Sequence, residues 1–117
     1  MTTTQKYQDG CRTLLEQAQI ELEAEDYRQS AEKAWGAAAQ AVKAVCTQRG
    51  WRHGSHRRLR VAAKRIAEET GDEEINLLFK AANLLHVNFY EDAYNHEEVS
   101  DGIDEVRRFV DKLDALP

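Results

Sequence analysis

The chain has 117 residues and a formal net charge of −5, with 42 % hydrophobic and 32 % charged residues, and its one proline is the last residue. A chain of this length can bury its own core, and a proline-free interior rich in helix-forming residues favours an all-α domain over a barrel or a sandwich. No segment approaches the roughly 18 apolar residues of a membrane span, and the first ten residues lack the apolar run of a signal peptide. We therefore expect one domain over residues 1–117, located in the cytoplasm and not in a membrane.

Two helices are predicted in the N-terminal half. Between residues 4 and 23, apolar residues recur at steps of three and four, which is typical of one helix face. These residues are Tyr7, Cys11, Leu14, Leu15, Ala18 and Leu22. Asp26 then offers a cap to a second helix that runs to Arg49, and Gly50 stops it.

The predicted helix ending at Arg49 is apolar around most of its circumference, so it belongs in the middle of a bundle or in a subunit interface. Residues 36–39 are one glycine and three alanines and lie beside Trp35. Because these side chains have little bulk, a neighbouring helix can approach closely there. That neighbour belongs either to the same chain or to a second copy in a dimer.

Three more helices are predicted in the C-terminal half. Ser55 caps a helix to about Thr70, Gly71 turns the chain, and the next helix runs from Glu73 to Tyr90. Asn95 resembles the start of a capping box that opens the last helix. Short connections make neighbouring helices antiparallel, so the prediction is an up-and-down bundle of about five helices. The two cysteines, Cys11 and Cys46, are expected to be small buried residues without a disulfide between them.

Two histidines are predicted to meet at one end of this bundle. His56 lies fifteen residues before Gly71 and His86 fifteen residues after it, so an antiparallel hairpin places them at the same height. Both also fall on the apolar stripes of their helices. The end of the preceding helix is expected to bring Arg49, Arg52 and His53 to the same place. Asn88, Tyr90 and Glu91 would approach from the end of the helix that carries His86.

This constellation admits several chemical interpretations. An imidazole near neutral pH can act as a base, and Glu91 can orient it. Core histidines that only stabilise the end of the bundle are the alternative. The spacing of His53 and His56 gives a metal-binding pattern of low specificity, so we predict neither a metal site nor a cofactor.

Charge is distributed very unevenly along the chain. Residues 49–65 contain seven basic and no acidic side chains, a formal charge of +7, whereas the rest of the chain carries nine basic and 21 acidic side chains, a formal charge of −12. A basic segment beside Trp51 can attract phosphate, a nucleotide or an RNA backbone, with the indole as a stacking face. The alternative is a solvated helix face whose arginines pair with neighbouring carboxylates. The predicted ligand-binding residues are Arg49, Trp51, Arg52, His53, His56, Arg57, His86, Asn88 and Tyr90.

Several blocks of the sequence resemble the PaREP-type proteins best known from archaea. These blocks are Ala31–Lys43, Arg49–Trp51, Gly54–Arg57 and Leu85–Glu91, and the resemblance extends over roughly residues 22–113. The wider pattern is similar to the HEPN (higher eukaryotes and prokaryotes nucleotide-binding) superfamily, which implies a helical bundle that is commonly dimeric. Many members of that superfamily are toxin ribonucleases or partners of nucleotidyltransferases.

The ribonucleases of that superfamily carry an arginine shortly before a histidine on the later helical hairpin. Here the window before His86 offers Lys80 in place of arginine, and Arg49 stands at this spacing only from His56, at the junction of two helices. The resemblance therefore favours a non-catalytic, homodimeric module that binds a nucleotide, RNA or a protein partner. The alternatives are a metal-independent ribonuclease with His56 or His86 as base and Arg49 or Arg52 as electrostatic stabiliser, and a structural or regulatory oligomer without a small ligand.

Overall fold

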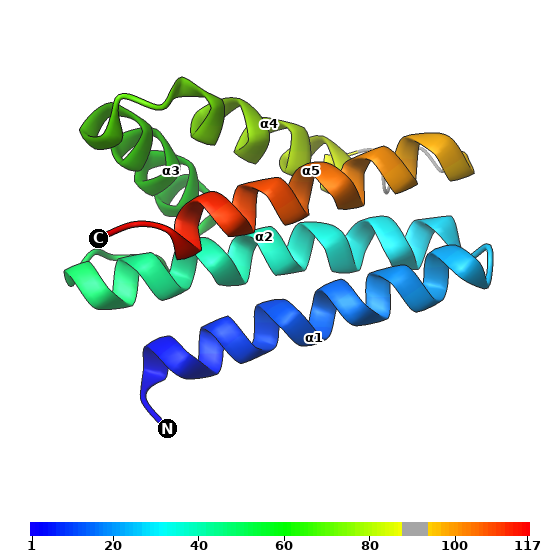
Figure 1. Cartoon of the computed structure of the whole chain (residues 1–117), viewed down its shortest axis with the longest axis horizontal. Coiled ribbons are helices and arrows are strands. Elements are labelled where there is room, and N and C mark those ends of the chain that lie inside the picture. The colour runs from blue at the N-terminus through cyan, green and yellow to red at the C-terminus, as the bar shows by residue number, and fades with distance from the viewer. Residues whose placement is uncertain (88–93) are drawn as a thin grey trace.

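The structure, a computed structural model, describes residues 1–87 and 94–117, and over these ranges it forms five α-helices without a strand (Figure 1). Their bounds are α1 Thr3–Glu23, α2 Tyr27–Arg49, α3 His56–Thr70, α4 Glu73–Val87 and α5 His96–Asp114. The predicted all-α bundle is confirmed, and the described helix ends agree closely with the predicted ones. The predicted end of the fourth helix at Tyr90 lies outside the described residues. No helix within the described ranges is long and apolar enough to cross a membrane.

The predicted helix caps are present. Asp26, Ser55 and Asn95 each accept a hydrogen bond from the backbone N–H three residues later, which satisfies a donor that the first helical turn leaves unpaired. Gly50 and Gly71 end α2 and α3 in the left-handed conformation, with φ of 71° and 70°. A residue with a Cβ would be strained at either position, so these glycines fix where the chain turns.

Helix α2 is the centre of the bundle and packs against all four other helices. Figure 1 shows it lying antiparallel to α1 along its whole length, with α5 crossing above it. The close approach predicted at the small residues is made by α1: a Cβ on Gly36 would lie 3.2 Å from Leu14 Cδ1, and one on Gly10 would lie 3.3 Å from Gln40 Oε1. The small residues of α2 therefore serve packing within the chain.

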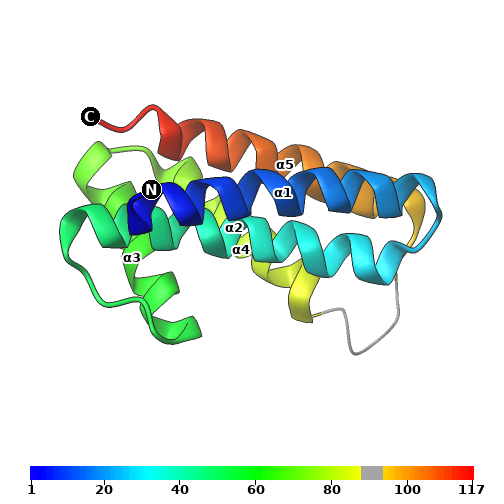
Figure 2. The same ribbon diagram turned by 90° about the horizontal axis from the view of Figure 1, so that it is seen from below.

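Helices α3 and α4 form a hairpin around Gly71, and α5 packs against α4. Gly102 of α5 allows this contact, since a Cβ there would lie 2.8 Å from Leu85 Cδ2. Among the described helices, α3 contacts only α2 and α4. In Figure 2 it lies on the side of the molecule away from α1 and α5. One side of α3 is therefore left exposed, and this side carries most of the basic segment.

A four-residue ion-pair network joins the start of α4 to α5. Lys112 Nζ lies 2.6 Å from Asp72 Oδ2 and 3.1 Å from Glu74 Oε1, and Arg108 Nε lies 2.6 Å from Glu74 Oε1. The hydrogen bond from Lys112 holds the pKa of Asp72 below its usual value, and the hydrogen bonds from Arg108 and Lys112 do the same for the pKa of Glu74. When Asp72 and Glu74 are ionised, the network therefore holds the α3–α4 hairpin against α5.

Both cysteines are free and buried, as predicted. Burial is the main cause that raises the pKa of the Cys11 thiol to about 11, and the nearby carboxylate of Asp114 acts in the same direction. Burial also raises the pKa of Cys46. Both side chains are small apolar members of the core, with no thiolate at neutral pH.

Candidate functional site

His56 and His86 lie close together, as predicted, and both contact the indole ring of Trp35. The ring centroids of His56 and His86 are 5.2 Å apart. His56 stacks on Trp35 with 4.6 Å between ring centroids and 4° between ring planes, and His86 lies 5.6 Å from the same indole. We call Trp35, His56 and His86 the histidine cluster. It joins the central helix α2 to the α3–α4 hairpin.

Polar side chains orient both imidazoles of the histidine cluster. His86 Nδ1 lies 3.0 Å from Glu32 Oε1 on α2, and His56 Nε2 lies 3.1 Å from Asn83 Oδ1 on α4. A carboxylate on one ring nitrogen fixes the imidazole and favours the tautomer that carries its proton there. Glu32 thus orients His86, a role that the sequence analysis gave to Glu91, which lies outside the described residues.

Arg49 does not join the histidine cluster, contrary to the sequence prediction. Its guanidinium forms an ion pair with Glu69, near the C-terminal end of α3. His56 begins that helix thirteen residues earlier, and a rise of 1.5 Å per residue separates the two ends by roughly 20 Å. The prediction failed because the connection 50–55 runs back alongside α3 instead of turning at the end of α2.

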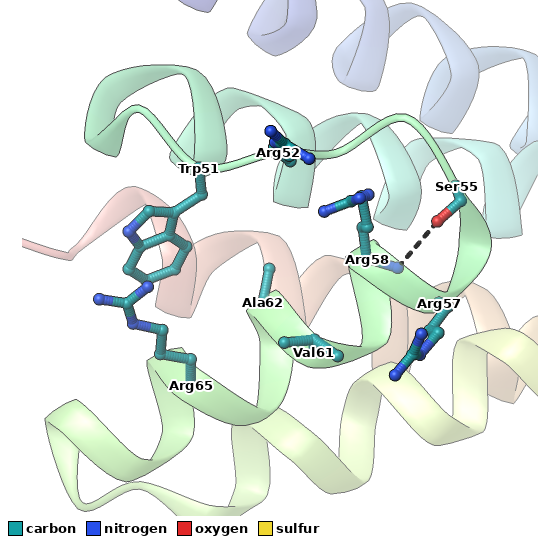
Figure 3. A pocket seen from close by; sticks show the side chains of 8 residues that line it. All are labelled: Trp51, Arg52, Ser55, Arg57, Arg58, Val61, Ala62 and Arg65. Atoms are coloured by element: carbon teal, nitrogen blue, oxygen red, sulfur yellow. Dashed lines mark hydrogen bonds between the residues drawn. The ribbon is translucent and has the colours of Figure 1, made fainter.

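Two of the predicted basic residues, Arg52 and Arg57, instead line an open pocket of about 470 Å³ between this connection and α3, together with Arg58 and Arg65, which the sequence analysis did not single out (Figure 3). We call it the arginine pocket. Its lining residues are Trp51, Arg52, Ser55, Arg57, Arg58, Val61, Ala62 and Arg65. Four of the eight are arginines and none is acidic. Figure 3 shows Trp51 and Arg65 at one end and Ser55, Arg57 and Arg58 at the other.

Trp51 positions arginines rather than presenting an open face. The guanidinium carbon of Arg65 lies 4.1 Å from the indole ring centroid, and that of Arg49 lies 5.2 Å from it. Cation–π contacts of this kind hold a guanidinium in place without neutralising it. Arg65 is also tied to Glu69, at 3.2 Å, so this end of the pocket is fixed from two sides.

Most of the basic segment is not neutralised by carboxylates. Within the described ranges, five of its seven cations have no carboxylate oxygen within 4 Å: Arg52, Arg57, Arg58, Arg60 and Lys64. The alternative of a fully paired helix face therefore holds only for Arg49 and Arg65. Closely spaced like charges without counter-charges create a positive potential that attracts anions.

His53 lies apart from both His86 and the arginine pocket. Its ring meets the edge of Tyr7 at 5.5 Å between centroids, and both rings line a second open pocket that also reaches His56. Asn88, Tyr90 and Glu91 lie outside the described residues. Among the residues that the structure does describe, no three histidine, cysteine or acidic side chains group closely enough to hold a metal ion.

The sequence analysis did not single out Glu32, Trp35 and Asn83, which contact the two histidines. Glu32 and Trp35 lie three residues apart on α2 and so share one face of that helix. Trp35 is buried, whereas Glu32 is partly exposed. A charged residue beside a buried tryptophan is a local signal that could have indicated a site.

Comparison with known proteins supports a defined family. The sequence pattern of the archaeal PaREP1/PaREP8 family matches residues 6–110. A protein from Sulfolobus solfataricus with a known crystal structure is 26 % identical, with a TM-score of 0.80, and the match covers 89 % of this chain and 92 % of that one. No protein of curated function matches the sequence significantly.

Proposed function

The chain belongs to the archaeal PaREP1/PaREP8 family, and we propose that it is a non-catalytic module that binds the phosphates of a nucleotide or of an RNA strand in the arginine pocket. The observation that carries the proposal is the pocket lining, which within the described part of the chain has four arginines and no carboxylate. Guanidinium groups bind phosphate oxygens through paired N–H donors. The proposal includes kinship with the HEPN superfamily and the cytoplasmic location expected from the sequence.

The surroundings of the pocket support a phosphate ligand over an acidic protein surface. Arg57 and Arg58 open α3 directly after Ser55, so they stand beside a helix N-terminus, where the backbone dipole favours anions. Arg60 and Lys64 extend the positive charge along the same helix. A strand of phosphates can follow such a row, whereas a mononucleotide engages only its first turn.

Fluorescence polarisation of a short labelled single-stranded RNA tests the proposal. We expect saturable binding that weakens as salt rises, because bound phosphates release counterions. Replacing two phosphate-binding cations, Arg57→Ala/Arg58→Ala, should weaken binding about tenfold or more and lower the slope of log affinity against log salt by about 1.4.

The matched control is Arg12→Ala/Arg107→Ala, which removes the same charge from α1 and α5. Both arginines are exposed and lie on helices that do not contact α3. The control should bind RNA within about twofold of the wild type. Equal weakening by the two double variants would mean that only net charge matters, and absence of binding to any anion would overturn the proposal.

One observation favours ribonuclease activity as a second candidate function. Glu32, His86 and His56 form a connected row that resembles an oriented general base. The arginine that such a reaction needs is less well placed, since Arg49 is engaged by Glu69. Incubation with RNA in EDTA distinguishes the two functions: cleavage that disappears in His56→Ala/His86→Ala would establish the nuclease, and retention without cleavage the binding module.

A homodimer is also part of the proposal, and the outer face of α4 is the surface that supports it. Leu77, Leu84 and Val87 are 56 %, 58 % and 48 % exposed, and their spacing of seven and three residues places them on one side of the helix. Large apolar side chains gathered on one exposed face are typical of an interaction surface. Among the small residues of α2, Gly36 already faces Leu14 of α1, and Ala37 and Ala38 are fully buried within the chain.

A further inference from the structure

We propose that the base of the bound ribonucleotide enters a second pocket, on the opposite side of residues 52–58, the end of the connection 50–55 and the start of α3, from the arginine pocket. This inference rests on the proposed function and names the chemical unit that the site recognises: a nucleoside monophosphate, either free or as one residue of an RNA strand. We call the second pocket the aromatic pocket.

The aromatic pocket is lined largely by flat rings. It has a volume of about 460 Å³, and four of its lining residues are Tyr7, Trp35, His53 and His56. Ala39 and Leu59 contribute buried apolar surface. Among the residues that the structure describes, neither aspartate nor glutamate lines this pocket. Rings with apolar surface between them suit a planar ligand, since stacking and burial both favour it.

The rings form two separate groups with space between them. On one side, His53 meets Tyr7 edge to face at an interplanar angle of 82°. On the other, His56 lies flat on Trp35. Both pairs line the same pocket, so a planar base can contact a ring on either side. Tyrosine, tryptophan and histidine are the side chains on which unstacked bases commonly stack.

Polar groups at the rim can read the edge of a base. Lys43 lines the pocket, its Nζ lies 5.9 Å from the centroid of the Tyr7 ring, and it has no carboxylate within 4 Å among the described residues. An ammonium group donates to unprotonated ring nitrogens or to carbonyl oxygens, and every nucleobase has at least one of these two kinds of acceptor. The Ser55 hydroxyl accepts a hydrogen bond from the Arg58 N–H, so its own proton is available to a ligand.

The order of residues along the connection joins the two pockets. Arg52 lines the arginine pocket, His53 and Gly54 line the aromatic pocket, and Ser55 lines both. After Ser55, His56 lines the aromatic pocket, and Arg57 and Arg58 line the arginine pocket. The backbone of residues 52–58 therefore separates the two pockets. A Cβ on Gly54 would meet nothing within 4 Å, so there is open space beside this backbone at Gly54. A nucleotide that passes over Gly54 places its base in one pocket and its phosphate in the other.

Isothermal titration calorimetry can separate the base from the phosphate. The ligands are the four nucleoside monophosphates, ribose 5-phosphate as the unit without a base, and a short single-stranded RNA. We expect at least one nucleoside monophosphate to bind about tenfold or more tightly than ribose 5-phosphate, because stacking of one base contributes on that order. The RNA could bind while no mononucleotide binds more tightly than ribose 5-phosphate. This result would show that a single base adds nothing to the affinity, and it would overturn the inference.

The variant His53→Ala removes one ring of the aromatic pocket, and His96→Ala is its matched control. His96 forms the same edge-to-face contact with Tyr27, at 5.8 Å and 90°, at the start of α5. We expect His53→Ala to lose most of the preference for the nucleotide over ribose 5-phosphate while ribose 5-phosphate still binds as in the wild type. His96→Ala should retain the preference.

The outcomes distinguish the two proposals. Equal affinity for ribose 5-phosphate and all four nucleotides overturns the base pocket and leaves the phosphate site standing. The base pocket is also overturned if His53→Ala weakens the binding of ribose 5-phosphate as much as that of the nucleotide while its helicity by circular dichroism is unchanged. Failure of every phosphate ligand to bind overturns the proposed function and the inference together.

Discussion

His56 lies flat on Trp35, with 4.6 Å between ring centroids and 4° between ring planes. The indole is 7 % exposed and belongs to the core, whereas the imidazole covers it from the solvent side. This contact connects the helix that organises the bundle to the first residue of the helix that carries the basic segment. The stack is therefore one of the contacts that join α3 to α2.

Truncation of the two stacked residues should have unequal effects. We expect Trp35→Ala to lower the free energy of unfolding by about 3–5 kcal/mol, since it leaves a cavity in the core. His56→Ala should cost only about 0.5–1.5 kcal/mol, the value of an aromatic contact at the edge of the core. Urea denaturation of both variants and of the double variant measures the coupling, which should be about 0.5 kcal/mol or more. Additive costs would show that the stack does not contribute.

The raised pKa of the Cys11 thiol predicts a loss of stability at alkaline pH. Burial raises this pKa to about 11, whereas an unfolded thiol ionises near its ordinary value of 9.0. The folded state therefore keeps a proton that the unfolded state releases, so stability falls as pH rises from about 9 to about 11. Urea midpoints across this range should fall less in Cys11→Ala than in the wild type. If the urea midpoints of the wild type and Cys11→Ala fell equally with pH, the loss of stability would not come from the Cys11 thiol.

The network around Lys112 predicts the opposite pH dependence at acid pH. Hydrogen bonds from Lys112 and Arg108 hold the pKa values of Asp72 and Glu74 below their ordinary values. At a pH above the ordinary values, both carboxylates therefore contribute their full share to the stability of the folded state. This contribution is lost as the pH falls through the lowered pKa values. Asp72→Asn/Glu74→Gln should be less stable than the wild type at pH 7, and the two unfolding curves should converge near pH 2. If the difference in stability between the variant and the wild type were the same at all pH values, the ionised carboxylates would not be its cause.

The apolar face of α4 predicts a concentration-dependent dimer. Leu77→Asp/Leu84→Asp should shift sedimentation towards the monomer, because a carboxylate in an apolar interface is left unpaired. Val61→Asp is the matched control: Val61 is equally exposed, at 57 %, but it lies on α3. A wild-type protein that is monomeric at all concentrations would contradict the dimer.

The helices and their buried faces could be predicted from the sequence because each depends on local periodicity and capping. The stripe of Val99, Ile103 and Val106, for example, is buried as its spacing indicates. The contact between His56 and His86 was predictable for a similar reason, since a tight turn at Gly71 fixes which residues face each other across a hairpin.

The path of the connection 50–55 was not predictable in this way. No periodicity or cap determines where an irregular segment runs, and this one follows α3 and separates the arginines from the histidine cluster. Glu32 was missed because its contact with His86 joins residues 54 positions apart. Such a contact depends on how α2 packs against α4, which no local pattern encodes.

The measurement that tests the central claim most directly is an NMR titration of the arginine Nε–H resonances with ribonucleotide. Binding in the arginine pocket predicts saturable shifts for Arg52, Arg57 and Arg58 that share one dissociation constant, together with unchanged resonances of Arg12 and Arg107 on the other helices. Equal small shifts of all arginines, or shifts confined to residues outside α3 and its preceding connection, would contradict it.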